Sequence, residues 1–123
     1  MRDKLIPTGI YTVVVLETEI KRTYRGNQYI EALLEITSSG TYHGHRIFAN
    51  FVFKPDNKIS TRFFNTNIRA FGIDDFCLAC PLPLLADELI GKTAQVHVTM
   101  REWGGCIFNE VVGVQPRQVL EGT

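Results

Sequence analysis

The chain has few of the features that mark secreted, membrane or disulfide-rich proteins. Its three cysteines, Cys77, Cys80 and Cys106, are an odd number without the spacing of a disulfide framework, so we expect reduced thiols. No stretch reaches the roughly 18 apolar residues of a membrane span. The opening residues, MRDKLIPTG, lack the apolar core of a secretion signal. These absences predict a cytoplasmic protein without a membrane partner.

Internal repeats and low-complexity tracts are also missing. The chain has 123 residues, of which 45% are hydrophobic, enough for one packed core and too few for two domains. We therefore expect a single domain over residues 1–123, with short flexible ends at residues 1–6 and 117–123.

Catalytic motifs are absent as well. The sequence has no glycine-rich phosphate loop, no nucleophile elbow and no paired carboxylates in a credible pocket, so we expect neither catalysis nor a cofactor. One alternative is a zinc site built from His43, His45, Cys77 and Cys80, and a rarer one is redox chemistry at the cysteine pair. The simpler interpretation is that Cys77 packs as a small apolar residue and the histidines occupy a turn, which leaves no metal site.

The chain has no excess of either charge, with thirteen bases and thirteen acids. The charges are nevertheless unevenly distributed. Residues 21–69 hold eight bases and three acids, whereas residues 70–123 hold three bases and seven acids. Such polarity indicates an anionic partner held by one half of the chain, unless folding mixes the charges again.

Alternating apolar residues predict three strands in the first half. Residues 10–20 form the first, and the polar run KRTYRGNQ at residues 21–28 is typical of a hairpin loop. Residues 29–37 form the second, with a core face of Ile30, Ala32, Leu34 and Ile36. After a turn at residues 38–44, the third strand covers residues 46–54, with one face made of Ile47, Ala49, Phe51 and Phe53.

A helix separates these strands from the last two. Residues 55–57 offer an N-cap to a helix over residues 58–71, which Gly72 stops and which should bury Ile59, Phe63, Ile68 and Phe71. Residues 73–89 are irregular, with one short helix after Pro83. The fourth strand covers residues 93–103, with inward Ala94, Val96, Val98 and Met100. Two glycines then lead into a fifth strand over residues 106–114.

Three strands, a helix and two strands is the element order of the OB-fold. We therefore predict a mainly β fold, a five-stranded OB-fold-like barrel with its helix between strands 3 and 4. A split α+β sheet and a small sandwich are the competing architectures.

An OB-fold binds its ligand across the outer face of strands two and three, between the loop joining the first two strands and the loop joining the last two. Both loops combine bases with aromatics, the composition needed to hold phosphates and stack bases of single-stranded DNA. The candidate binding residues are Lys21, Arg22, Tyr24, Arg25, Tyr29, Arg46, Phe48, Asn50, Arg101 and Trp103.

Two of these aromatics have a competing interpretation. Trp103, at a hairpin tip, either stacks on a base or folds back over the end of the barrel, and Phe48 either stacks or is buried beneath a loop. Glu31 and Glu35 share the outward face and would repel a phosphate backbone, unless they pair with Arg46 and Lys54 or the strand passes nearer the loops.

From Pro7 to Pro116 the sequence resembles a family of phage single-stranded DNA-binding proteins, formerly a domain of unknown function. The similar stretches are PTGIYTVVV with the trailing ETEIKRTYRGNQY, the G-x-Y-x-G-x-x-I-F run at residues 40–48, NIRAFGI, ELIGK and FNEVVGVQP. The resemblance implies an OB-fold that coats single strands in the host cytoplasm during phage DNA replication or recombination, without metal or catalysis.

Carried onto this chain, the resemblance favours Lys21, Arg22, Tyr24 and Arg25 in the first loop, with Arg46 and Phe48 on the third strand. The case for Trp103 comes from its own position. The chain departs from the pattern in its neutral charge and in lacking a clear acidic C-terminal tail, which bears on affinity and on recruitment of host proteins.

The main rival function is a protein-interaction module that uses the same barrel to dock a replication or recombination partner. A contiguous apolar patch with dispersed bases would favour it. Because outer strands of such a sheet can pair between copies, a homodimer is compatible with the sequence.

Overall fold

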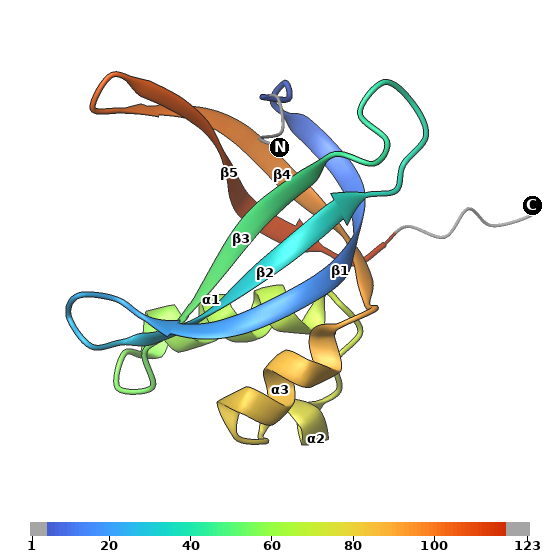
Figure 1. Cartoon of the computed structure of the whole chain (residues 1–123). Helices are drawn as coiled ribbons and strands as arrows, with labels where there is room; N and C mark the ends of the chain where they lie inside the picture. The colour runs from blue at the N-terminus through green and yellow to red at the C-terminus, as the bar shows by residue number, and fades with distance from the viewer. Residues whose placement is uncertain (1–4, 118–123) are drawn as a thin grey trace, which may run out of the picture.

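The computed structural model describes residues 5–117 (Figure 1). Three strands come first: β1 (Gly9–Arg22), β2 (Gln28–Ile36) and β3 (Arg46–Phe53). Three helices follow: α1 (Lys58–Arg69), α2 (Asp75–Leu78) and α3 (Leu82–Leu89). The last two strands are β4 (Thr93–Trp103) and β5 (Cys106–Gln115). The five strands and the helical segment between strands 3 and 4 confirm the mainly β prediction.

The strands form one antiparallel sheet in the order β3-β2-β1-β4-β5. The sheet curls until its edge strands, β3 and β5, come into contact, but no ladder joins them within residues 5–117. A cavity of about 260 Å³, lined by side chains of both edges, lies between them. The hydrogen-bonded ladder therefore does not close into the predicted barrel.

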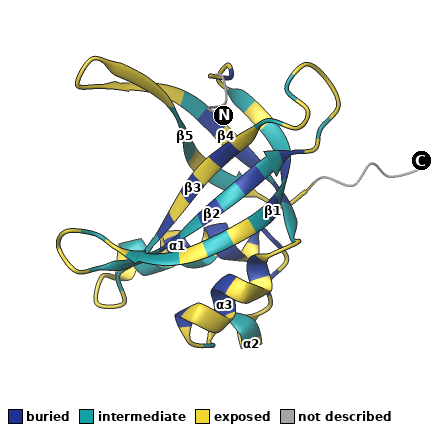
Figure 2. Cartoon of the chain, in the orientation of Figure 1, coloured by how far each residue is buried: buried dark blue, intermediate teal, exposed yellow. Residues whose placement is uncertain are grey.

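The core lies inside this curl, and the strand alternation predicts most of it. Every second residue of β2 is buried, from Ile30 to Ile36, and the inward residues of β4 are buried as far as Val98 (Figure 2). Met100 was predicted to be inward but is 49% exposed. The reason is that the β4–β5 hairpin extends beyond the part of the sheet that curls over the core (Figure 1).

Helix α1 begins as the sequence predicts and buries a different face. The side chain of Asn57 caps it by accepting the Ser60 backbone N–H at 2.9 Å. Phe64 and Ile68 are buried, whereas Ile59 and Phe63 of the predicted stripe are exposed. Phe71, which is buried, lies after the end of the helix at Arg69.

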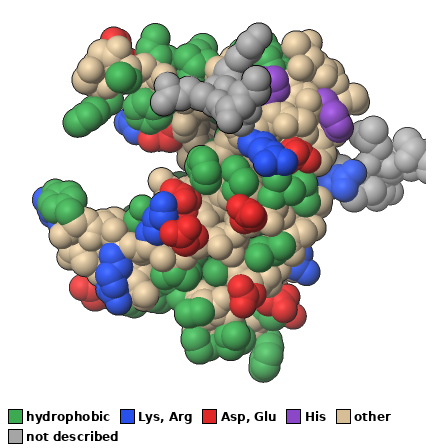
Figure 3. All heavy atoms as spheres, in the orientation of Figure 1, with side chains coloured by type: hydrophobic (Ala, Val, Ile, Leu, Met, Phe, Trp, Pro, Cys, Tyr) green, Lys and Arg blue, Asp and Glu red, His purple; other side chains and the backbone are tan. Residues whose placement is uncertain are grey.

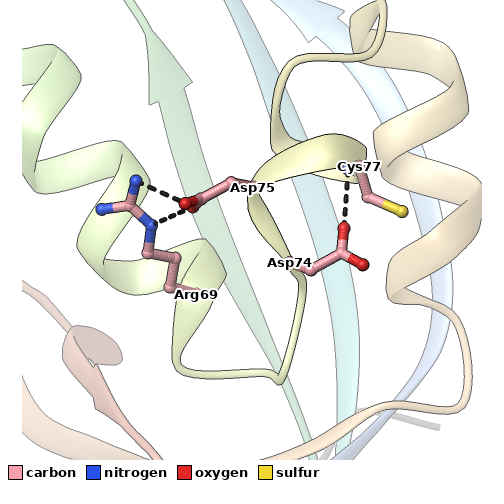
Figure 4. Close-up of polar contacts among 4 residues, drawn as sticks. All are labelled: Arg69, Asp74, Asp75 and Cys77. Atoms are coloured by element: carbon pink, nitrogen blue, oxygen red, sulfur yellow. Dashed lines mark hydrogen bonds and ion pairs between the residues drawn. The ribbon is translucent and has the colours of Figure 1, made fainter.

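The segment after α1 contains two helices where the sequence predicts one. Asp74 caps α2 by accepting the Cys77 N–H at 2.8 Å, and Arg69 of α1 pairs with Asp75 at 3.0 Å (Figure 4). Helix α3 begins before Pro83, because proline fits the first turn of a helix, where its missing N–H has no partner to lose. Within residues 5–117 no helix is long and apolar enough to span a membrane.

The end of β1 and the segment that precedes β1 both differ from the prediction. β1 continues through Lys21 and Arg22, so the loop shortens to residues 23–27, where Gly26 adopts φ +90°. Ile6, placed by the sequence in a flexible end, is buried and exchanges hydrogen bonds with the Asn109 side chain at 2.9 Å. Most of the predicted flexible ends, residues 1–4 and 118–123, lies outside the described residues.

Candidate functional site

The outward face of β1, β2 and β3 is arranged in rows of cross-strand partners. One row joins Lys21 to Tyr29 and Val52, and another joins Glu17 to Leu33 and Phe48. Phe48 is 57% exposed, so it is not buried beneath a loop. Together with Leu33 beside it, Phe48 gives the middle of the face an apolar platform.

The β1–β2 hairpin carries an aromatic and two cations at its tip. Tyr24 is 92% exposed, and the guanidinium of Arg25 lies 5.6 Å from its ring centre and donates to its hydroxyl at 3.2 Å. Arg22, at the end of β1, donates to the Gly26 carbonyl at 3.0 Å. A ring exposed to this extent contributes little to the core.

The β4–β5 hairpin forms a second arm. Trp103 is 79% exposed, next to the Gly104-Gly105 turn, so it does not fold back over the sheet. Arg101 pairs with both carboxylate oxygens of Glu110 at 2.8 Å. Phe108, the cross-strand partner of Arg101, lies on the same face and was missed by the sequence analysis. Pairing residues outward from the two-glycine turn sets Phe108 opposite Arg101, so the sequence could have identified Phe108.

A groove connects the two arms. Phe48, Ala49 and Asn50 of β3 line the cavity between the edge strands on one side, and residues 108–111 of β5 line the other. Figure 3 shows the hollow between the arms, with hydrophobic side chains on both. The groove thus has one aromatic ring on each edge, Phe48 and Phe108, and an aromatic at the end of each arm, Tyr24 and Trp103.

Acidic side chains lie beside this platform, on β1 and β2. A cavity of about 430 Å³ brings the two together, because its lining residues are Glu17, Thr18, Glu19, Glu31, Leu33, Phe48 and Ile90. Lys21 reaches Glu31 at 3.0 Å, and this hydrogen bond raises the pKa of Lys21 above its ordinary value. The carboxylate of Glu31 therefore already compensates part of the positive charge of Lys21.

Of the two pairings considered for the outward glutamates, one forms. Arg46 pairs with Glu35 at 3.4 Å, whereas Glu31 pairs with Lys21 rather than Lys54. The repulsion expected over Glu31 and Glu35 is thus relieved within the protein. The acids of β1, Glu17 and Glu19, remain on this side of the face, away from the β3–β5 groove.

The ten predicted binding residues fall into three groups. Tyr29, Arg46, Phe48 and Asn50 share the outward face of β2 and β3, with Lys21 beside them. Arg22, Tyr24 and Arg25 lie at the first hairpin, and Arg101 and Trp103 at the second. The three groups surround the groove, with the two hairpins projecting toward the same side in Figure 1.

The alternative zinc site does not assemble. Across residues 5–117 no three His, Cys, Asp or Glu side chains gather as metal ligands would. Cys77 packs against the core, and burial together with the nearby Asp74 raises the pKa of its thiol (Figure 4). A thiol with a raised pKa is a poor nucleophile at neutral pH, which disfavours redox chemistry at Cys77.

Comparison with known proteins gives a family and no function. No curated protein matches the chain. A family profile described as a protein of unknown function (DUF669) matches residues 2–122, which is nearly the entire sequence. The chain belongs to the DUF669 family.

Proposed function

We propose that the protein binds single-stranded DNA without base specificity and acts in phage DNA replication or recombination. The observation that carries this proposal is the set of exposed aromatics around one groove. Tyr24 and Trp103 lie on the two hairpin arms, and Phe48 and Phe108 line the cavity between the edge strands. Every base has a flat face to stack, so such rings bind a single strand regardless of its sequence.

The arrangement of elements supports an OB-like assignment of the fold. A three-strand meander, a helical segment and a closing hairpin follow one another, and the edges β3 and β5 meet without pairing. An OB-fold is a partly open barrel that binds its ligand over strands two and three, between the same two loops. The groove of this chain lies between β3 and β5, with the two hairpins at its ends, and this likeness to the OB-fold arrangement supports the proposal.

The charges support a binding mode in which stacking supplies much of the affinity. Lys21, Arg46 and Arg101 are each within 3.4 Å of a glutamate. A phosphate must therefore compete with a carboxylate for these cations. Duplex DNA offers phosphates but hides its base faces, so the same groove should discriminate strongly against it.

A salt-titrated comparison of binding to single-stranded DNA, single-stranded RNA and duplex tests the proposal. We expect the single-stranded DNA to bind at least tenfold more tightly than the duplex at 50 mM salt. An affinity for duplex equal to that for the single strand, or no mobility shift at low salt, would contradict the proposal.

A protein-interaction module is the second candidate, and helix α1 favours it. Ile59 and Phe63, one turn apart, are both exposed, at 85% and 60%. Neighbouring exposed apolar side chains are typical of a docking surface for a replication or recombination protein. Replacing Phe63 with serine should leave DNA binding unchanged if this surface serves a protein.

A further inference from the structure

The cations of the described residues divide into paired and unpaired sets. Those on the outward face and the second hairpin are held by glutamates, as described above. Seven others form no ion pair with the acids of residues 5–117. Two of them, Lys92 and Arg117, stand apart in the sequence. The other five belong to the first hairpin or to the segment from the end of β3 into α1, namely Arg22, Arg25, Lys54, Lys58 and Arg62.

These two segments are neighbours in the structure. Gln28, the first residue of β2, pairs with Phe53, the last residue of β3. Lys54 therefore follows directly beside the base of the β1–β2 hairpin, and the β3–α1 turn lies next to that hairpin in Figure 1. The only acid in the connecting turn is Asp56, which is exposed and forms no ion pair with a described residue.

Helix α1 presents its cations along one exposed stripe. Lys58 and Arg62 are four residues apart, so they lie on the same side, about 6 Å apart along the helix axis. A cavity of about 390 Å³ opens beside them, lined by Pro55, Lys58, Thr61, Arg62, Asn65 and Arg69, with no carboxylate in its wall. Arg69, at the far end, is the member that pairs with Asp75.

The position of Lys58 is unfavourable for the helix itself. It occupies the first turn of α1, which contains no acidic residue, although the partial positive charge of a helix N-terminus favours acids there. Neither packing nor an ion pair explains this lysine, since it is exposed and unpaired among the described residues. An external anion would explain it.

We propose that Lys54, Lys58 and Arg62 form a second contact for the sugar-phosphate backbone of the bound single strand. The strand leaves the aromatic groove beside the β1–β2 hairpin and continues along the exposed stripe of α1. Stacking and phosphate binding are then divided between two surfaces, which accounts for the unpaired cations lying away from the acidic face. The inference rests on the proposed function, because its occupant is the same strand.

The test compares three proteins by their binding to oligo(dT) of 30 and 6 nucleotides: the unaltered chain, Lys58→Gln/Arg62→Gln, and the control Lys92→Gln. For single strands each phosphate contact contributes about −0.7 to the slope of log K against log salt. If Arg22, Arg25, Lys54, Lys58 and Arg62 each contact one phosphate, the unaltered chain should lose about 130-fold in affinity between 50 and 200 mM salt. The double variant keeps three of these contacts and should lose about 20-fold.

We expect the double variant to show the smaller loss with dT30, and to match the unaltered chain with dT6, which spans only the groove. Lys92→Gln should behave as the unaltered chain does. Equal salt slopes for the double variant and the unaltered chain would overturn the inference while leaving the proposed function intact. The inference would also be overturned if the double variant lost binding to polyglutamate but bound oligo(dT) as the unaltered chain does. That result would identify the stripe as a docking surface for an acidic protein. Absence of any binding by the unaltered chain would overturn both.

Discussion

Phe48 is the residue whose exposure is hardest to explain by folding alone. It lies on a central part of β3, flanked by Ala49, and its ring remains 57% exposed although the core is one residue away. Its cross-strand neighbour Leu33 is also outward, so the two form an apolar surface in water. A stacked base would cover that surface and stabilise the complex.

We predict that Phe48→Ala weakens binding of single-stranded DNA by about fivefold or more, since loss of one stacking ring removes about 1–3 kcal/mol. The melting temperature should change little, because the ring is not part of the core. Phe76→Ala, which removes an exposed phenyl ring on α2, is the matched control and should bind as before. Equal affinities for the two variants would remove Phe48 from the site.

Asp74 makes stability depend on pH. Hydrogen bonds from the Cys77 backbone lower the pKa of its carboxyl below the ordinary value of 3.8 (Figure 4). A lowered pKa in the folded state means that Asp74 stabilises the fold fully above pH 3.8 and that this contribution is lost as pH falls through the folded pKa. The cap therefore weakens in acid.

Asp74→Asn should remove this dependence, because an amide oxygen can still accept the Cys77 N–H but does not titrate in this range. Thermal unfolding followed between pH 5 and pH 2 should show a steeper loss of melting temperature for the unaltered chain than for the variant. Parallel curves would mean that the cap does not titrate with the fold.

Most inward and outward residues of the strands could be predicted, because a strand has a period of two and one face must be buried. Met100 is the exception already described, because it lies beyond the part of the sheet that covers the core. Helix α1 shows the limit of predicting a buried face from the apolar pattern. The sequence offers Phe63 and Phe64 side by side, and the apolar pattern cannot tell which faces the sheet. The choice is made by contact with β3 and β5, including Asn67, whose side-chain oxygen accepts the Val114 N–H at 3.3 Å. That contact is tertiary and leaves no local signal.

At the scale of elements, α1 combines an optimal cap with a misplaced charge. Asn57 satisfies a backbone donor, whereas Lys58 in the next position opposes the helix dipole. Residues selected for a ligand are often unfavourable for the element that carries them.

Lys58→Glu should therefore stabilise the protein by about 0.5 kcal/mol while weakening its binding to DNA. Urea unfolding measures the first effect and oligo(dT) titration the second. Arg62→Glu, in the middle of the helix, is the control, since it lies beyond the reach of the dipole and should weaken binding without stabilising the fold. A loss of stability in Lys58→Glu would show that the lysine serves the helix.

Strand β1 and helix α3 show why element ends are harder to predict than elements. Polar residues suggested that the first strand ended before Lys21, yet pairing with Tyr29 and Gln28 continues it to Arg22. The sequence placed a short helix after Pro83, but α3 begins at Leu82, because Pro83 fits its first turn. In each case a neighbouring strand or a favourable first turn overrides the local preference.

The whole molecule separates its charges in a way that net charge conceals. The surplus of bases in residues 21–69 and a pairing of Arg46 with an outward glutamate could be read from the sequence. The pairs that neutralise Lys21 and Arg101 could not, because they depend on strand register. The candidate groove was predicted through the two hairpins and the outer face of β3. Phe108 and the unpaired cations of α1 emerged only when the curled sheet brought β5 and α1 beside β3.

The central claim is that a single strand passes between the two hairpins and stacks on their aromatics. Trp103 is the only tryptophan, so its fluorescence reports on this site alone. We predict that adding oligo(dT) at 50 mM salt quenches that fluorescence in a saturable way, and that raising the salt reverses it. Binding of oligo(dT) that leaves Trp103 fluorescence unchanged, or no binding at all, would contradict the account.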